Sequence, residues 1–303
     1  MRIVSLIASS TELVCALGFE KNLVGRSHEC DWPASVQKLP ACSEPKFNIH
    51  GTSKEIDERV KHVLANSLSV YRVHVEALKA LKPDVIVTQD HCEVCAVSLK
   101  DVERAVCDWL GPKVKIVALK PNDLADIWDG FRDVAQALGS PSAGDHLVQH
   151  CQGRMEAISK QALQETKRPS VATIEWIDPL MPAGNWVPEL ITMLGAKNLF
   201  GQAGKHSPWM EWEDLRHKDP DVIVVMPCGW DMARARQEMP ILLQKPGWKE
   251  LKAVKEGRVY LTDGNQYFNR PGPRLVESLE ILAEIFYPHT FSFGHESHGW
   301  QKF

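Results

Sequence analysis

Two short segments of the sequence carry side chains that bind soft or borderline metal ions. Cys92 and Cys95 are separated by two residues, with His91 directly before the first of them, and His28 and Cys30 lie in the segment HECDW. Zinc and iron sites commonly combine a CxxC pair with a second pair of ligands. Cys92, Cys95, His28 and Cys30 therefore predict a zinc or iron site. The alternative is a buried turn in which reduced cysteines only pack.

Both segments follow apolar runs that are typical of buried strands, at residues 23–25 and 83–87. Short runs of this kind alternate with helical segments along the chain, and this alternation predicts parallel α/β sheets. Ligands of such sheets bind at the carboxyl ends of the strands. We therefore expect the loops that follow the strands to form the binding site.

Five such loops are rich in aromatic, acidic and polar side chains. Together they predict a cleft with aromatic walls, which suits a large, flat and partly apolar ligand. The aromatic side chains include Trp32, Trp176, Trp186 and Trp230. These tryptophans could instead belong to the core, but we expect their rings to be at least partly exposed. The candidate ligand-binding residues are His28, Glu29, Cys30, Trp32, Asp90, His91, Cys92, Cys95, Glu175, Trp176, Asn185, Trp186, Trp230, Tyr267, Phe268 and Arg270.

The segment PDVIV occurs twice, at residues 83–87 and 220–224, and each copy follows an LG pair and a short apolar run in the same order. This repeat predicts two similar lobes. A helical pattern at about residues 143–166 predicts one long helix between them, about 33 Å long. The predicted fold class is α/β, with two lobes of mostly parallel sheet joined by one long rigid helix.

The repeat also suggests where the domains begin and end. We expect an N-terminal α/β lobe at 1–120 with an insertion at about 41–75, and a helical segment with the linking helix at 121–168. A C-terminal α/β lobe at 169–288 and a mobile tail at 289–303, with three histidines, complete the chain.

Composition excludes several classes of protein. The 303 residues are 44% hydrophobic and 24% charged, with a net charge of −4, so we expect no nucleic-acid partner. No apolar run approaches ~20 residues, so we expect no membrane insertion. We also expect a monomer. The first strand begins near the N-terminus without a signal pattern, and the eight cysteines are sparse. The expected location is therefore the cytoplasm, or the periplasm if a signal peptide is missing from this sequence.

The sequence contains no GxSxG elbow, no P-loop and no GxGxxG after a strand, so we expect a binding protein and not an enzyme. The alternative is a metal-dependent enzyme, or a zinc- or iron-binding protein, that uses the His28, Cys30, Cys92 and Cys95 cluster.

Several longer segments together resemble a known family. They include LVGRSHECDWP, LKPDVIV, AGNWVPELITMLGAKNLF and VYLTDGNQYFNRPGPRLVESL. The chain resembles the cobalamin-binding members of the substrate-binding proteins of ABC importers, in the class with a rigid helical backbone that also carries haem and siderophores. The resemblance implies a corrinoid ligand in a cleft between two lobes, with no cofactor required.

The resemblance also implies an ABC transporter permease as a partner. Family members dock on the transporter through an acidic residue near the start of a helix in each lobe, and Glu76 and Glu213 match those positions. The helix dipole alone also favours acidic residues in a first turn. The insertion and the HCEVC loop depart from the simplest relatives, and they suggest a cytoplasmic corrinoid carrier in which Cys92, Cys95 or His28 could ligate cobalt.

Overall fold

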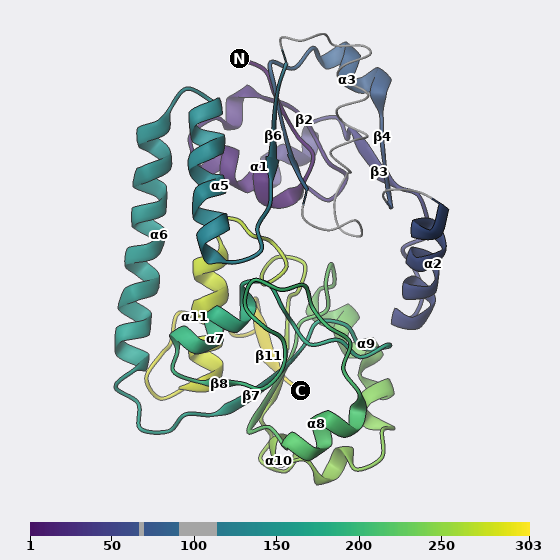
Figure 1. Cartoon of the computed structure of the whole chain (residues 1–303), viewed down its shortest axis with the longest axis vertical. Helices are drawn as coiled ribbons and strands as arrows, with labels where there is room; N and C mark the ends of the chain where they lie inside the picture. Colours follow the sequence, from purple (N-terminus) through teal and green to yellow (C-terminus); the bar gives the residue numbers. More distant parts are fainter. Residues whose placement is uncertain (67–69, 91–113) are drawn as a thin grey trace. The chain divides into compact units, whose positions relative to one another are not determined.

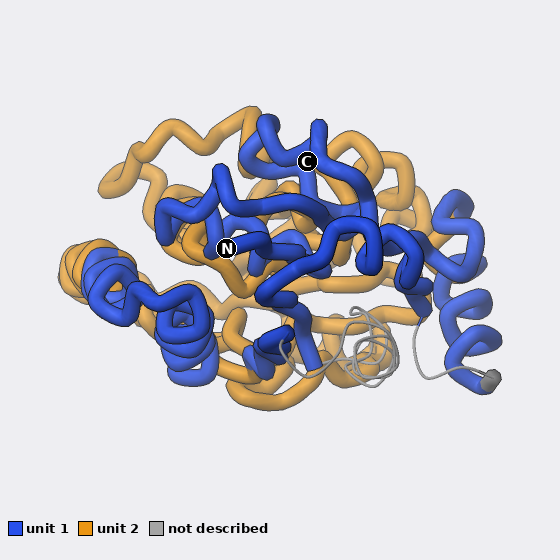
Figure 2. Tube along the Cα trace, turned by 90° about the horizontal axis from the view of Figure 1, so that it is seen from above, with its two compact units in different colours: residues 1–51, 55–121, 125–150 blue, residues 52–54, 122–124, 151–303 orange. Residues whose placement is uncertain are grey.

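The computed structural model describes residues 1–66, 70–90 and 114–303. His91, Cys92 and Cys95 lie outside the described residues. The chain divides into two compact units (Figure 2). Unit 1 comprises residues 1–51, 55–121 and 125–150, and unit 2 comprises residues 52–54, 122–124 and 151–303.

Unit 1 is built on a four-stranded parallel sheet in the order β2-β1-β5-β6 (Figure 1). All five residues of β5 are buried, as expected for a β-branched run in a central strand that is covered on both faces. Its strands are β1 (Ile3–Ser5), β2 (Leu23–Arg26), β5 (Val85–Gln89) and β6 (Lys115–Leu119), and its helices include α1 (Ala8–Ala16), α3 (Val75–Leu81) and α5 (Leu124–Ala137).

The expected insertion forms a small substructure of its own. Strands β3 (Ser43–Pro45) and β4 (Tyr71–Val73) pair antiparallel, and α2 (Ser53–Asn66) lies between them in the chain. Cys42, directly before β3, is fully buried with Val4 and Leu78 in the core of unit 1. The insertion is therefore packed against the sheet that carries His28.

Unit 2 repeats this plan with a five-stranded sheet in the order β11-β10-β9-β7-β8, in which only β11 is antiparallel. Its strands are β7 (Ser170–Ile174), β8 (Lys197–Asn198), β9 (Val222–Val225), β10 (Val259–Thr262) and β11 (Trp300–Lys302). Its helices are α7 (Val187–Met193), α8 (Trp212–Lys218), α9 (Met232–Leu243), α10 (Lys252–Lys255) and α11 (Leu275–Phe286). The predicted α/β fold class with mostly parallel sheets is confirmed.

The two PD segments have the same local structure in both units. Helices α3 and α8 each end at a residue in the left-handed region, Lys82 with φ 46° and Asp219 with φ 40°. The following aspartate then accepts a hydrogen bond at 2.7 Å from a backbone N–H at or next to the start of a neighbouring strand, Asp84 from Arg2 and Asp221 from Ser170. The sequence repeat thus reflects a repeated helix–turn–strand motif.

The predicted long helix is α6 (Pro141–Ala162), with 22 residues. The boundary between the two units falls inside it, at residues 150 and 151. Buried residues recur along it at helical spacing: Val148, Cys151, Met155, Ile158 and Ala162. A side chain at Gly144 would come within 2.6 Å of Ala135 Cβ, so glycine there allows α6 to pack closely on α5.

The expectation of a mobile C-terminal tail was wrong. Residues 300–302 form β11, which pairs antiparallel with β10. The buried Glu284 carboxylate of α11 accepts hydrogen bonds from Gly294 N–H at 2.7 Å and from Trp300 Nε1 at 2.6 Å. The tail is therefore part of unit 2.

Candidate ligand-binding site

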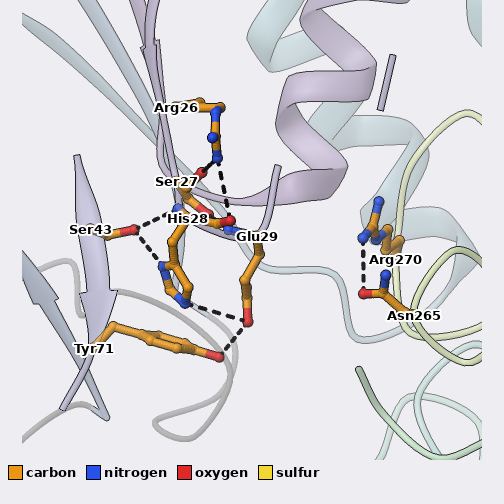
Figure 3. A network of polar contacts seen from close by, with 8 residues as sticks. All are labelled: Arg26, Ser27, His28, Glu29, Ser43, Tyr71, Asn265 and Arg270. Atoms are coloured by element: carbon orange, nitrogen blue, oxygen red, sulfur yellow. Dashed lines mark hydrogen bonds and ion pairs between the residues drawn. The ribbon is translucent and has the colours of Figure 1, made fainter. Parts of the chain in front are cut away.

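In unit 1, His28 lies directly beyond the carboxyl end of β2, in a turn that Arg26 stabilises (Figure 3). Arg26 Nη1 donates hydrogen bonds to the carbonyl oxygens of Ser27 at 2.8 Å and His28 at 3.3 Å. The imidazole Nδ1 lies 2.9 Å from Ser43 Oγ, and the ring packs against Tyr71 with centroids 4.9 Å apart. Side chains of the insertion therefore fix the orientation of His28.

The Glu29 carboxylate lies beside this imidazole. The Tyr71 hydroxyl donates a hydrogen bond to Glu29 Oε1 at 2.7 Å, and His28 Nε2 lies 3.9 Å from the same oxygen. Burial, Arg26 and His74 lower the pKa of His28 to about 4. The imidazole is therefore neutral at neutral pH, the form in which histidine ligates metals and accepts or donates one hydrogen bond.

The surroundings of Cys30 do not favour a role as a metal ligand. Its side chain is buried, and Thr11 Oγ1 donates a hydrogen bond to its sulfur at 2.9 Å. Burial raises the pKa of the Cys30 thiol, which disfavours the thiolate that a metal needs. Among the described residues, no group of three or more His, Cys, Asp or Glu side chains is arranged to hold a metal ion. These findings do not support the predicted zinc or iron site, although Cys92 and Cys95 are outside the description.

Two other candidates of unit 1 lie at the surface. The Trp32 side chain is 50% exposed, in agreement with the expected open ring. Asp90 follows β5 directly and forms an ion pair with Lys120 at 3.2 Å.

In unit 2, Trp176 and Trp230 follow β7 and β9, and their rings contact each other with centroids 4.9 Å apart. The Arg234 guanidinium lies 4.2 Å from the Trp230 ring centroid and pairs with the buried Glu238 at 3.0 Å. Glu238 also accepts hydrogen bonds from Ser53 N–H and Oγ. Trp176 is partly exposed, but Trp230 is only 8% exposed, so the prediction of an open ring was wrong for Trp230.

The prediction was also wrong for Trp186, which is 5% exposed. Its Nε1 donates a hydrogen bond at 2.9 Å to the carbonyl oxygen of Phe268, which is itself buried with φ 56°. Trp186 therefore fixes the loop after β10. In that loop the buried Arg270 donates to Asn265 Oδ1 at 3.0 Å (Figure 3), and Tyr267 has the Arg274 guanidinium 5.4 Å from its ring centroid.

Glu175 and Asn185 lie in the loop that joins β7 to α7. Ser207 Oγ donates to Glu175 Oε2 at 2.9 Å. Asn185 adopts φ 51°, a left-handed conformation that is uncommon for a residue other than glycine, and its buried Oδ1 atom has no hydrogen-bond partner among the described residues. A strained backbone with an unpaired acceptor is typical of positions that contact ligands.

Four residues that shape these two regions were not among the residues predicted from the sequence. Ser43 and Tyr71 belong to the insertion, and their role follows only from the β3–β4 pairing that places them beside His28. Arg234 and Glu238 lie one turn apart on α9, after Asp231 has capped that helix through Arg234 N–H. The one signal in the sequence for the contact between the Arg234 guanidinium and the Trp230 ring was that these residues lie four positions apart.

The two glutamates that match the docking positions occupy equivalent sites. Glu76 is the second residue of α3 and Glu213 the second residue of α8, with side chains 84% and 57% exposed. Each pairs with a basic side chain three residues later, Lys79 at 2.6 Å and Arg216 at 2.7 Å. Their role in docking stays a prediction.

Two similar α/β units whose carboxyl-edge loops gather aromatic and polar side chains define a small-molecule binding protein. Residues 3–266 match the family model described as periplasmic binding protein, and the chain belongs to this family. The expectation of a binding protein and not an enzyme is thereby confirmed.

Relatives and solved structures agree with this assignment. The chain is 26% identical to the uncharacterized ABC transporter substrate-binding lipoprotein YvrC of Bacillus subtilis, over 96% of this chain and 81% of the relative. It is 23% identical to a vitamin B12-binding protein of Vibrio vulnificus, over 94% and 89% of the two chains.

The same fold occurs in a periplasmic heme binding protein from Pseudomonas aeruginosa, with a TM-score of 0.71 and 21% identity over 95% and 93% of the two chains. It also occurs in the periplasmic vitamin B12 binding protein BtuF of Vibrio cholerae, with a TM-score of 0.67 and 19% identity over 94% and 95%. These comparisons do not support the expected cytoplasmic location. In the described part of the chain, no helix has the length and apolar character needed to span a bilayer.

Proposed function

We propose that this substrate-binding protein carries a corrinoid and delivers it to an ABC importer. The ligand contacts are the loops described above for each unit, with His28, Glu29 and Trp32 in unit 1 and Trp176, Tyr267 and Arg270 in unit 2. The vitamin B12-binding relatives support this choice of ligand.

The observation that carries the proposal is the partly exposed Glu29 carboxylate beside a neutral imidazole. Corrinoids carry neutral amide side chains around the ring, and their N–H groups are donors for a carboxylate. The propionates of haem are anionic, and Glu29 would repel them. The Asn185 Oδ1 of unit 2, which has no hydrogen-bond partner in the described part of the chain, is a second acceptor suited to an amide donor.

Haem is the second candidate, because the neutral His28 and the adjacent Tyr71 are side chains that bind haem iron. The heme-binding protein with the same fold supports this alternative. In either case a flat, metal-containing macrocycle is the ligand class.

The proposal is tested by titrating the purified protein with hydroxocobalamin and, separately, with haemin, following tryptophan fluorescence and visible absorption. We expect hydroxocobalamin to bind more tightly than haemin. Glu29→Ala should weaken corrinoid binding by about tenfold, the equivalent of ~1.4 kcal/mol, and strengthen haemin binding. Asp145→Ala removes an exposed carboxylate of unit 1 that pairs with Arg132, away from the His28 turn, and serves as the matched control. Preferential binding of haemin, unaffected by Glu29→Ala, would contradict the proposal.

We propose further that Glu76 and Glu213 contact basic residues of the transporter. Their equivalent placement in the two units supports a pair of matched contacts. Glu76→Lys and Glu213→Lys should abolish uptake of the ligand by cells while leaving its affinity for the isolated protein unchanged. Wild-type uptake with both substitutions would refute the docking role.

A further inference from the structure

The C-terminal tail lies against the loop that follows β10, and the reason is topological. Because β11 pairs antiparallel with β10, with Trp300 opposite Thr262, the residues just before Trp300 must run beside the residues just after Thr262. Those residues after Thr262 belong to the loop at 263–273, which holds Tyr267, Phe268 and Arg270. Figure 1 shows β11 and α11 in yellow, as the last strand and helix of the chain.

Three contacts join the tail to this loop. Asp263 N–H donates a hydrogen bond to the Gly299 carbonyl oxygen at 2.9 Å. The His295 ring meets the Tyr267 ring nearly edge-on, with centroids 6.2 Å apart. A side chain at Gly299 would come within 2.6 Å of Ile281 Cδ1 and 3.3 Å of Tyr267 Cε2, so the tail backbone fits tightly under the Tyr267 ring.

Two buried carboxylates of α11 hold the tail in this position. Glu284 is 4% exposed and accepts hydrogen bonds from the backbone N–H groups of Phe293, Gly294 and His295, and from Trp300 Nε1. Glu280 is 7% exposed and lies between His295 at 2.8 Å and Arg154 at 2.6 Å. A buried carboxylate is stable only when it is paired, so losing the tail would remove these partners of Glu284 and leave Glu280 with Arg154.

We propose that residues 295–300 are a brace that holds Tyr267 and the 263–273 loop in the ligand-binding conformation. His295 and Gly299 are then positioning residues that influence ligand affinity through Tyr267 without touching the ligand. This inference rests on the proposed function, because it requires that the 263–273 loop contact the ligand.

The brace has an expected pH dependence. The Glu280 carboxylate raises the pKa of His295 against the effect of burial, with Glu284 and Glu277 adding to the rise, whereas His295 and Arg154 together hold the pKa of Glu280 low against burial. Burial raises the pKa of the facing Tyr267 hydroxyl, so that group stays neutral, and the Arg274 guanidinium lies 5.4 Å from the Tyr267 ring centroid. The ion pair between His295 and Glu280 is fully formed below the pKa of about 6.5 that histidine has in the unfolded chain. It weakens as the pH rises through the pKa of His295 in the folded protein.

The experiment measures hydrogen-exchange protection factors of residues 263–273 and the Kd for hydroxocobalamin and haemin. It compares the wild type with His295→Gln and Gly299→Ala. His298→Gln is the matched control, because the ring of the exposed His298 hydrogen-bonds, among the described residues, only to the Glu296 carbonyl oxygen through its Nδ1. We expect both test variants to lose about tenfold in loop protection and in affinity for the probe that the wild type binds, while the control changes neither. The pH dependence of loop protection should flatten in His295→Gln.

Unchanged protection of residues 263–273 in both test variants would overturn the brace, even where the tail itself exchanges faster. Equal loss of protection throughout unit 2 would also overturn it, because the tail would then only stabilise the fold. If the wild type binds neither probe, the proposed function fails, and hydrogen exchange alone still decides the brace.

Discussion

Asp221, the aspartate of the second PDVIV segment, allows a quantitative test of the local structure. Its Oδ2 accepts hydrogen bonds from Ser170 N–H and Ser170 Oγ, both at 2.7 Å, and its Oδ1 lies 2.5 Å from Lys252 Nζ. Burial raises the pKa of Asp221, but the bonds from Lys252 and Ser170 outweigh burial and lower the pKa to about 2. The ionised carboxylate is therefore more stable in the folded protein than in the unfolded chain.

We predict that Asp221→Asn lowers the free energy of unfolding at neutral pH. A pKa lowered from 3.8 to about 2 corresponds to an upper bound of about 2 kcal/mol, and solvent screening reduces this to about 1–2 kcal/mol. Because the folded-state pKa is depressed, the stabilisation is present above the unfolded pKa of about 4 and is lost as the pH falls through about 2.

The assay is urea unfolding of wild type and variant, followed by tryptophan fluorescence, from about pH 7 down to about pH 3. The matched control is Asp84→Asn, at the equivalent position of unit 1, where the carboxylate also accepts a backbone hydrogen bond but is 61% exposed. Asp221→Asn should cost more than Asp84→Asn, and its cost should shrink with falling pH. A cost that stays constant over this range would show that the ionised Asp221 carboxylate does not stabilise the fold.

Three further predictions concern individual side chains of the candidate site. Trp186→Phe removes the hydrogen bond to the Phe268 carbonyl oxygen, so urea unfolding should show a loss of about 1–3 kcal/mol. Cys30, buried and hydrogen-bonded by Thr11 with a raised pKa, should resist iodoacetamide in the folded protein at neutral pH, and rapid alkylation seen by mass spectrometry would contradict its placement. His28, whose pKa is lowered to about 4, should stay neutral in an NMR titration at about pH 6. Since the unfolded chain takes up that proton first, His28→Gln should lose less stability than the wild type on acidification below about pH 6.5.

The sequence was sufficient to predict the features that depend on neighbouring residues. The two PDVIV runs are contiguous β-branched strands, and their helix–turn–strand context is local, so the repeat predicted the two similar units. The helical spacing of Cys151, Met155 and Ile158 likewise predicted α6.

Features that depend on distant pairing were not predictable in this way. Trp186 is buried because its indole reaches a carbonyl group 82 residues away, and the role of Tyr71 depends on a glutamate 42 residues away. The order of the tail depends on the pairing of β11 with β10 and on a glutamate of α11. No periodicity in the sequence reports such contacts.

The most direct test of whether this protein carries a corrinoid is the visible absorption spectrum of the protein purified from its own host. We expect a corrinoid spectrum that is lost on denaturation and restored when the refolded protein takes up hydroxocobalamin. A Soret band of bound haem, or a colourless protein that takes up no hydroxocobalamin, would contradict it.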